Sequence, residues 1–260
     1  MTNEYDLIAP FYDIEHKHFD EDIDLYLNFA EACGGPLLEL ACGSGRLLVP
    51  LARAGYSGTG VDASARMLEL ARRALEAEGL DARFTLRQQD MGALDKSETY
   101  GQKFRLAFVA LGSFAHVCTR REQRQALAGI HAHLTAGGTF ILDISNADVR
   151  YMESMGGQVL HQGTWTMDDG TLLTHFVSPA SAVSSHLLEL THFYDQHKQG
   201  EAVRRTISRT QLYLFERGEM ELLLESAGFA VKEVYGNYDL SPFENDSARM
   251  IFIAEKSVKA

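Results

Sequence analysis

Short apolar runs alternate with amphipathic stretches through the first part of the chain, and this pattern predicts strands that are each followed by a helix. The expected strands cover residues 36–41, 56–61, 82–89, 104–111 and 139–145, and the expected helices cover residues 44–54, 64–78 and 119–134. The first run, residues 37–41, is apolar except for Glu39, as a strand buried in a parallel sheet requires. The pattern predicts an α/β sheet with helices on both faces and ligands beyond the carboxyl ends of its strands.

Residues 158–214 depart from this pattern, because they consist of β-rich segments separated by turn residues. Turns are expected at residues 168–170 and 198–200, so antiparallel strands should form a small lobe. A helix that ends near Gly228 and two further strands, at residues 231–235 and 250–254, complete the chain. The expected division is N-terminal helices with the α/β core at residues 1–157, an inserted β lobe as substrate lid at 158–214, and a C-terminal helix with the last strands at 215–260.

A glycine-rich turn directly follows the first expected strand. Gly43 and Gly45 permit a tight bend and leave no side chain between the backbone and a ligand. Asp62 ends the second expected strand about twenty residues later, where a carboxylate can accept both hydroxyls of a ribose. A dinucleotide fingerprint would require Gly or Ala at position 48, and Leu48 stands there. The turn therefore favours a nucleoside ligand without a pyrophosphate.

These residues resemble the first motif of the class I S-adenosylmethionine-dependent methyltransferases, which reads as an acid, two residues and then Cys-Gly-x-Gly. The matching residues are Glu39, Cys42, Gly43, Gly45 and Arg46. The resemblance continues, in the family's order, through Asp62 and residues 89–91, 110–113 and 136–139, and residues 229–256 fit the strand pair that ends the family's sheet. It implies a Rossmann-like sheet of parallel strands with an antiparallel last strand. Members that methylate small amines, the amino-sugar and glycine N-methyltransferase-like enzymes, carry a similar β insertion.

The resemblance also implies a cofactor, S-adenosylmethionine, with S-adenosylhomocysteine as its product. In the family's pattern Asp62 holds the ribose, Asp90 binds the adenine amino group beside Met91, and Arg46 meets the methionine carboxylate. Met67 would lie against the adenine, although helical spacing equally predicts that it packs in the core. The remaining cofactor-binding candidates are Tyr5, Tyr12, Glu39, Ala41, Cys42, Gly43, Gly45, Ala63, Leu111 and Gly112.

Catalysis and acceptor binding are assigned to fewer residues. The N-terminal segment, residues 5–13, resembles a family lead-in that closes over the donor, so Tyr12 could face a cationic sulfonium. His116 follows the fourth strand, where the acceptor approaches in this fold, and an imidazole there could take a proton. A structural role is the alternative for each. Arg209 and Tyr213 would share a strand face that could line the acceptor pocket, and a surface charge cluster with Arg204 and Arg205 is an equal alternative. The histidines of the lobe are expected to be solvated or to pack.

The composition of the chain excludes some classes of binding partner. A net charge of −12 opposes nucleic-acid binding, and the absence of an Asn/Asp-Pro-Pro-Tyr signature disfavours nucleobase and amide acceptors. Three unclustered cysteines and a start without a leader pattern favour the cytoplasm, with no metal site and no membrane association. The expected activity is methyl transfer to nitrogen or oxygen of a small molecule. A nucleotide-dependent oxidoreductase and a non-catalytic binding module are the alternatives, and a homodimer is the assembly considered.

Overall fold

The computed structural model describes residues 4–94, 100, 103–146, 157–181, 186–198 and 200–257. The chain forms two compact units, each described here by itself. The lobe comprises the described parts of Met1–Phe19 and Ala147–Leu214, and the core comprises those of Asp20–Asn146 and Phe215–Ala260. The first helix thus groups with the β lobe, whereas the sequence had placed it with the core. None of the helices in the described ranges has the length and apolar character needed to cross a bilayer.

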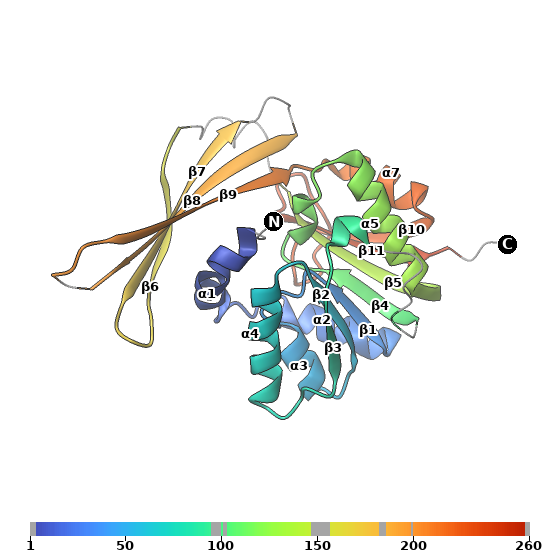
Figure 1. Ribbon diagram of the computed structural model, residues 1–260. Helices are drawn as coiled ribbons and strands as arrows, with labels where there is room; N and C mark the ends of the chain where they lie inside the picture. Colours follow the sequence, from blue (N-terminus) through green and yellow to red (C-terminus); the bar gives the residue numbers. More distant parts are fainter. Residues whose placement is uncertain are drawn as a thin grey trace. The chain divides into compact units, whose positions relative to one another are not determined.

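The core contains a seven-stranded sheet in the order β10-β11-β5-β4-β1-β2-β3 (Figure 1). Strands β1 to β5 run parallel, β11 runs antiparallel to β5, and β10 runs antiparallel to β11. The strands are β1 (Leu37–Leu40), β2 (Gly58–Asp62), β3 (Phe84–Gln88), β4 (Phe104–Val109), β5 (Leu134–Ser145), β10 (Phe229–Tyr235) and β11 (Arg249–Lys256). This topology confirms the predicted α/β sheet with an antiparallel end.

Helices flank this sheet and begin where the sequence supplies capping groups. Ser64 accepts a hydrogen bond from the backbone N–H of Met67 at the start of α4, and Thr119 accepts one from Glu122 at the start of α5. The helices of the core are α2 (Ile23–Cys33), α3 (Leu48–Arg53), α4 (Ala65–Glu76), α5 (Arg120–His133) and α7 (Arg217–Ser226), with short 3₁₀ helices η1 (Met91–Ala93) and η2 (Ser113–His116).

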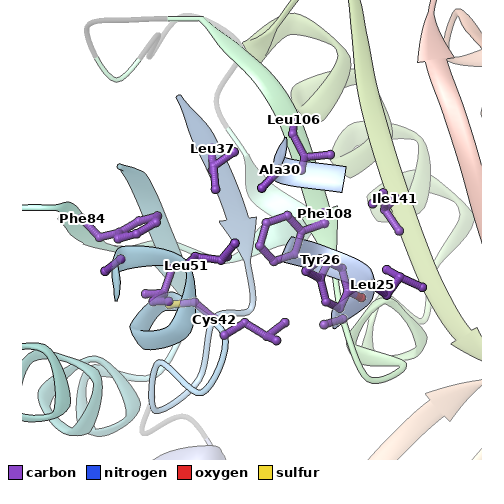
Figure 2. Packing of buried hydrophobic residues seen from close by; sticks show 14 of the residues in the cluster. Leu25, Tyr26, Ala30, Leu37, Cys42, Leu51, Phe84, Leu106, Phe108 and Ile141 are labelled. Atoms are coloured by element: carbon purple, nitrogen blue, oxygen red, sulfur yellow. The ribbon is translucent and has the colours of Figure 1, made fainter. Parts of the chain in front are cut away.

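The central strands and α2 share a hydrophobic core. Tyr26 of α2 lies against Phe108 of β4 with ring centroids 4.7 Å apart, and both side chains are fully buried (Figure 2). Leu37 of β1 and Leu106 of β4 belong to the same cluster. Because burying a side chain of this size contributes about 1.5–3 kcal/mol, this cluster fixes the strands whose carboxyl ends carry the candidate site.

The lobe contains helix α1 (Glu4–His16) and a four-stranded antiparallel sheet. Its strands are β6 (Leu160–Thr166), β7 (Leu172–Ser181), β8 (Leu187–His197) and β9 (Arg204–Tyr213). Helix α1 packs on this sheet through Ile8 and Phe11, which form a buried cluster with Leu173 and Tyr194. The structure therefore contains the predicted antiparallel lobe.

Candidate functional site

The turn after β1 is built from residues in the left-handed region. Ala41, Gly43 and Gly45 have φ values of 55°, 54° and 84°. A Cβ at Gly45 would lie 3.1 Å from the Cβ of Ala71 in α4, so the turn passes close to this helix. Helix α3 begins only at Leu48, because the preceding residues form turns, whereas the sequence predicted a start at residue 44. The glycines thus serve the fold as well as any ligand.

Asp62 joins the carboxyl ends of β1 and β2. Its Oδ2 accepts the backbone N–H of Gly43 at 2.8 Å, and its Oδ1 accepts the backbone N–H of Ser64 at the same distance. Each carboxylate oxygen has two lone-pair sites, so a carboxylate held in this way retains the capacity to accept hydroxyl groups. The acid and the glycine turn, which the sequence predicted to act together, are in direct contact.

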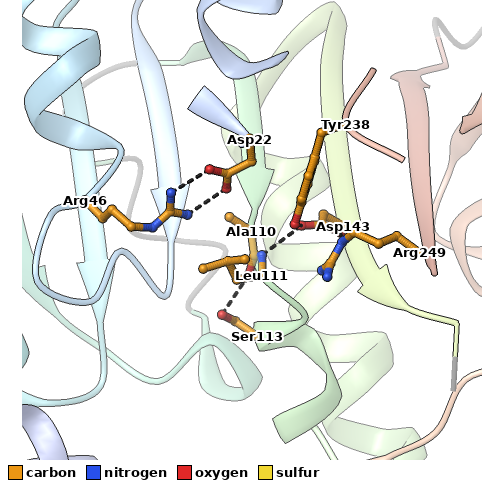
Figure 3. A network of polar contacts seen from close by, with 8 residues as sticks. All are labelled: Asp22, Arg46, Ala110, Leu111, Ser113, Asp143, Tyr238 and Arg249. Carbon is orange, nitrogen blue, oxygen red and sulfur yellow. Dashed lines mark hydrogen bonds and ion pairs between the residues drawn. The ribbon is translucent and has the colours of Figure 1, made fainter. Parts of the chain in front are cut away.

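Arg46 is committed to a partner that the sequence did not indicate. Its guanidinium donates two hydrogen bonds to the carboxylate of Asp22, at 2.5 and 2.6 Å (Figure 3). The Asp22 side chain is fully buried and that of Arg46 is 15% exposed. Asp22 directly precedes α2 but makes no capping hydrogen bond with its side chain. Two of the five N–H groups of Arg46 are thus used by a buried aspartate, and the predicted contact of Arg46 with a ligand carboxylate would have to use the remaining donors.

Glu39 lies in the middle of β1, between Gly60 of β2 and Phe108 of β4 in the register of the sheet. Its side chain is buried, and Oε2 has no hydrogen-bond partner among the described residues. Desolvation raises the pKa of this carboxyl well above its usual value, and the positive charge of Arg46 opposes that shift. Burial also raises the pKa of the Cys42 thiol, which stays protonated and acts as a packing group.

The candidates for the adenine side differ in exposure. Asp90 is exposed, and its Oδ1 accepts the backbone N–H of Gly92 at 2.8 Å at the start of η1. Met91 is mostly buried, and Met67 is only 2% exposed, which favours core packing over the adenine contact for Met67. Ala63 is half-buried beside Asp62, and its carbonyl accepts a hydrogen bond from Gln88.

A buried acid holds the turn that follows β4. Leu111 and Gly112 have φ values of 50° and 74°. The backbone N–H of Leu111 donates to Oδ2 of Asp143 at 2.9 Å, and that of Gly112 donates to the Asp143 carbonyl at 3.0 Å. Tyr238 donates to the same Oδ2, and Arg249 donates to Oδ1 at 2.5 Å (Figure 3). No motif in the sequence indicated this network, because it joins the turn after β4 to side chains from β5, β11 and the segment between β10 and β11.

His116 ends η2, close behind this turn. The side chain is exposed at its surface, while the protein packed around it desolvates the imidazole and lowers its pKa to about 4. The imidazole is therefore neutral at pH 7, and one ring nitrogen carries a lone pair that can accept a proton.

The remaining candidates belong to the lobe. Tyr12 stacks on His16 with ring centroids 4.0 Å apart, and Tyr5 packs against the cluster formed by α1 and the sheet. Arg209 is exposed on β9, whereas Tyr213 is buried and stacks on His186 at 5.5 Å. The two residues lie at alternating positions of β9, as predicted, but Arg209 is exposed and Tyr213 is buried.

Comparisons with known proteins agree with this arrangement. Residues 37–138 match a family model described as a methyltransferase domain. The chain is 32% identical over 127 residues to glycine N-methyltransferase of Rattus norvegicus, which covers 46% of this chain and 43% of that protein. Two solved structures share the fold over nearly the whole chain. The first is the CcbJ methyltransferase from Streptomyces caelestis, with a TM-score of 0.79 and 21% sequence identity over 99% of both chains. The second is the sugar N-methyltransferase KedS8 from Streptoalloteichus sp. ATCC 53650, with a TM-score of 0.74 and 20% sequence identity over 99% of this chain and 94% of that chain.

Proposed function

We propose that this protein, a methyltransferase by the domain at residues 37–138, takes its methyl group from S-adenosylmethionine and passes it to nitrogen or oxygen of a small molecule. The observation that carries the proposal is the contact between the glycine turn and Asp62, at the carboxyl ends of two adjacent parallel strands. In a sheet of this type, such an edge binds nucleosides and their derivatives.

The residues around the turn suit a cationic nucleoside. Asp62 would accept the ribose hydroxyls, Asp90 would accept from the adenine amino group, and the unpartnered oxygen of Glu39 would face positive charge. The bound donor supplies a methyl group already activated on a positively charged sulfur. The protein's main task is then to orient the acceptor and exclude water, which can contribute about 7–11 kcal/mol in a favourable case.

His116 is proposed as the group that takes a proton from the acceptor. An ammonium must lose a proton to gain the lone pair that attacks, and His116 is exposed and neutral at pH 7, although a pKa of about 4 makes its imidazole a weaker base than an ordinary histidine. Tyr5 and Tyr12 are proposed to present aromatic faces to the sulfonium. Arg209 and Tyr213 are retained as acceptor-binding candidates of the lobe, the first with better support because it is exposed.

A small-molecule acceptor fits the net charge of −12, which disfavours nucleic acid. The sugar and glycine N-methyltransferases among the similar proteins favour an amine within that class. A cytoplasmic location is proposed because Cys33, Cys42 and Cys118 form no disulfide in the part of the chain that the structure describes. A homodimer is retained as the proposed assembly.

Calorimetric titration with S-adenosylhomocysteine, and separately with NADH, tests the donor. We expect binding of the first ligand only, an affinity loss of about tenfold or more in Asp62→Asn, and no change in the exposed control Asp81→Asn. A methyl-transfer assay against pooled amines, carboxylates and phenols then tests the acceptor class. Binding of NADH, or the absence of S-adenosylhomocysteine binding, would overturn the proposal.

A further inference from the structure

A buried carboxylate of β5 organises the turn that follows β4. We call residues 110–113 the β4 turn. Asp143 is fully buried, and it accepts two consecutive backbone N–H groups of this turn. The N–H of Leu111 bonds its side-chain Oδ2 at 2.9 Å, and the N–H of Gly112 bonds its carbonyl at 3.0 Å. The position of the β4 turn therefore depends on one residue of the neighbouring strand.

The β4 turn needs this support because its backbone is strained. Leu111 has a φ of 50°, and such a conformation costs a residue with a side chain about 1–3 kcal/mol. Gly112, at 74°, has no Cβ and avoids that cost. A strained residue keeps its conformation only where surrounding contacts fix it. Loss of the Asp143 carboxylate should therefore let the turn relax.

Two side chains from the last part of the chain fix Asp143 in its place. Arg249, at the start of β11, donates to Oδ1, and Tyr238 donates to Oδ2 at 3.0 Å (Figure 3). The Arg249 guanidinium also lies over the Tyr238 ring, 5.1 Å from its centroid. Burial raises the pKa of Asp143, whereas the charge of Arg249 and these hydrogen bonds lower it. These donors therefore stabilise the carboxylate form that holds the turn.

The order of the strands indicates which part of a ligand the β4 turn would meet. In the order β4-β1-β2-β3, the β4 turn lies on one side of the glycine turn, and Asp62 and Asp90 follow the two strands on the other side. In the proposed function these two acids hold the ribose and the adenine, so the nucleoside lies over β2 and β3. The amino-acid chain of the donor then extends past β1 towards β4.

The β4 turn offers that chain an unused hydrogen-bond acceptor. None of the described residues donates a hydrogen bond to the carbonyl of Leu111, which is half-buried. The neighbouring carbonyls, those of Ala110 and Gly112, are both bound within the turn and η2. An ammonium group has N–H donors and no acceptor, so it suits a carbonyl that is held in place.

We propose that Asp143 is a positioning residue, which holds the β4 turn in the strained form that presents the Leu111 carbonyl to the ammonium of the donor's amino-acid chain. Asp143 acts through the turn, because its own side chain is fully buried. Arg249 and Tyr238 act one step further back, by fixing its carboxylate. The inference deepens the proposed function and rests on it, since that function supplies the bound donor.

Two ligands with the same nucleoside separate this role from general stability. S-adenosylhomocysteine carries the amino-acid chain, and methylthioadenosine has a methyl group in its place. Asp143→Asn keeps the shape of the side chain but loses its charge. The milder Tyr238→Phe removes one hydrogen bond and keeps the ring beside Arg249. The matched control is Tyr235→Phe, because both tyrosines pack against the same core cluster and no hydrogen bond joins the Tyr235 hydroxyl to another described residue.

Calorimetry of the full-length protein measures both affinities, at a temperature where circular dichroism shows each variant to be folded. We expect Asp143→Asn to weaken S-adenosylhomocysteine binding about tenfold or more and Tyr238→Phe about threefold, with methylthioadenosine affinity within about twofold of wild type. Amide hydrogen exchange in residues 110–116 should be faster in both variants. The control should match wild type. Tyr238→Phe decides the question should Asp143→Asn fail to fold.

An equal loss of both affinities, or S-adenosylhomocysteine affinity that stays at the wild-type value, would overturn the positioning role. Unchanged exchange in residues 110–116 would overturn the action through the turn. Wild type that binds neither ligand would overturn the proposed function, and the inference with it. The failure of the inference alone therefore shows in the variants, and the failure of the function shows in wild type.

Discussion

Replacing Arg46 by Met should destabilise the protein without acting primarily on ligand affinity. The substitution leaves the fully buried carboxylate of Asp22 without its positively charged partner, and this side chain makes no capping hydrogen bond at the start of α2. Breaking a buried ion pair by removing one partner costs about 3–5 kcal/mol. The substitution also removes the positive charge of Arg46, which lowers the pKa of Glu39. Loss of this favourable interaction should destabilise the folded state further.

The reverse substitution, Asp22→Leu, should cost less, towards the lower end of that range, because Arg46 is 15% exposed and keeps some contact with water. The double variant Asp22→Leu/Arg46→Met buries no unpaired charge and should recover most of the loss, with a coupling of about 2 kcal/mol or more. The exposed pair of Arg53 and Glu78 supplies the control, since Arg53→Met should change stability little.

Urea unfolding at pH 7.5, followed by circular dichroism, measures these free energies, and calorimetry with S-adenosylhomocysteine measures affinity. An Arg46 that serves the ligand instead would show the opposite pattern, with a large loss of affinity and an unfolding free energy close to that of wild type. Additive effects of the two single substitutions would equally refute the pairing.

Three further substitutions test other parts of the core by the same unfolding experiment. Gly45→Ala should destabilise more than Gly79→Ala, because both need a positive φ but only Gly45 has a neighbour within 4 Å; equal losses would contradict the close approach. Asp143→Asn should cost about 3 kcal/mol, towards the lower end of the same range, because the amide removes the negative partner of Arg249, which is 17% exposed; a small loss would show that the pair is dispensable. The lowered pKa of His116 implies that the unfolded state binds the proton first, so stability should fall as pH drops from 6.5 towards 4, and His116→Gln should flatten this slope; an unchanged slope would contradict the shift.

The parallel core could be predicted because its signals are local. The apolar run around Leu38 must be a strand once glycines bound it, and the structure has β1 at Leu37–Leu40. Residues 37–138 match a methyltransferase domain, in agreement with the family resemblance that the glycine turn and Asp62 carry. The start of α3 was wrong, because Leu47, Leu48 and Leu51 have helical spacing although residues 43–47 are held in turns by the contacts of Gly45 and Asp62.

Side-chain pairing across strands could not be predicted, because it depends on register. Alternation along β8 gives the face of His192, but only the pairing of Val177 with His192 brings His175 within hydrogen-bond distance. A shift of one residue would place His175 on the other face of the sheet. The assignment of α1 to the lobe has the same origin, since it depends on contacts with Leu173 and Tyr194 far along the chain.

The long-range pairs also explain the electrostatic character of the site. Arg46 and Arg249 both lie near these strand ends, and each is bound to a buried aspartate that lies far from it in sequence. Glu39 and Asp62 remain there as acids; burial is the main cause of the raised pKa of Glu39, and the negative charges of Asp22 and Asp62 add to it. A positive ligand would relieve this repulsion, whereas a pyrophosphate would increase it. The proposed preference of this edge for a sulfonium over a dinucleotide therefore rests on how the two arginines are paired as well as on Leu48.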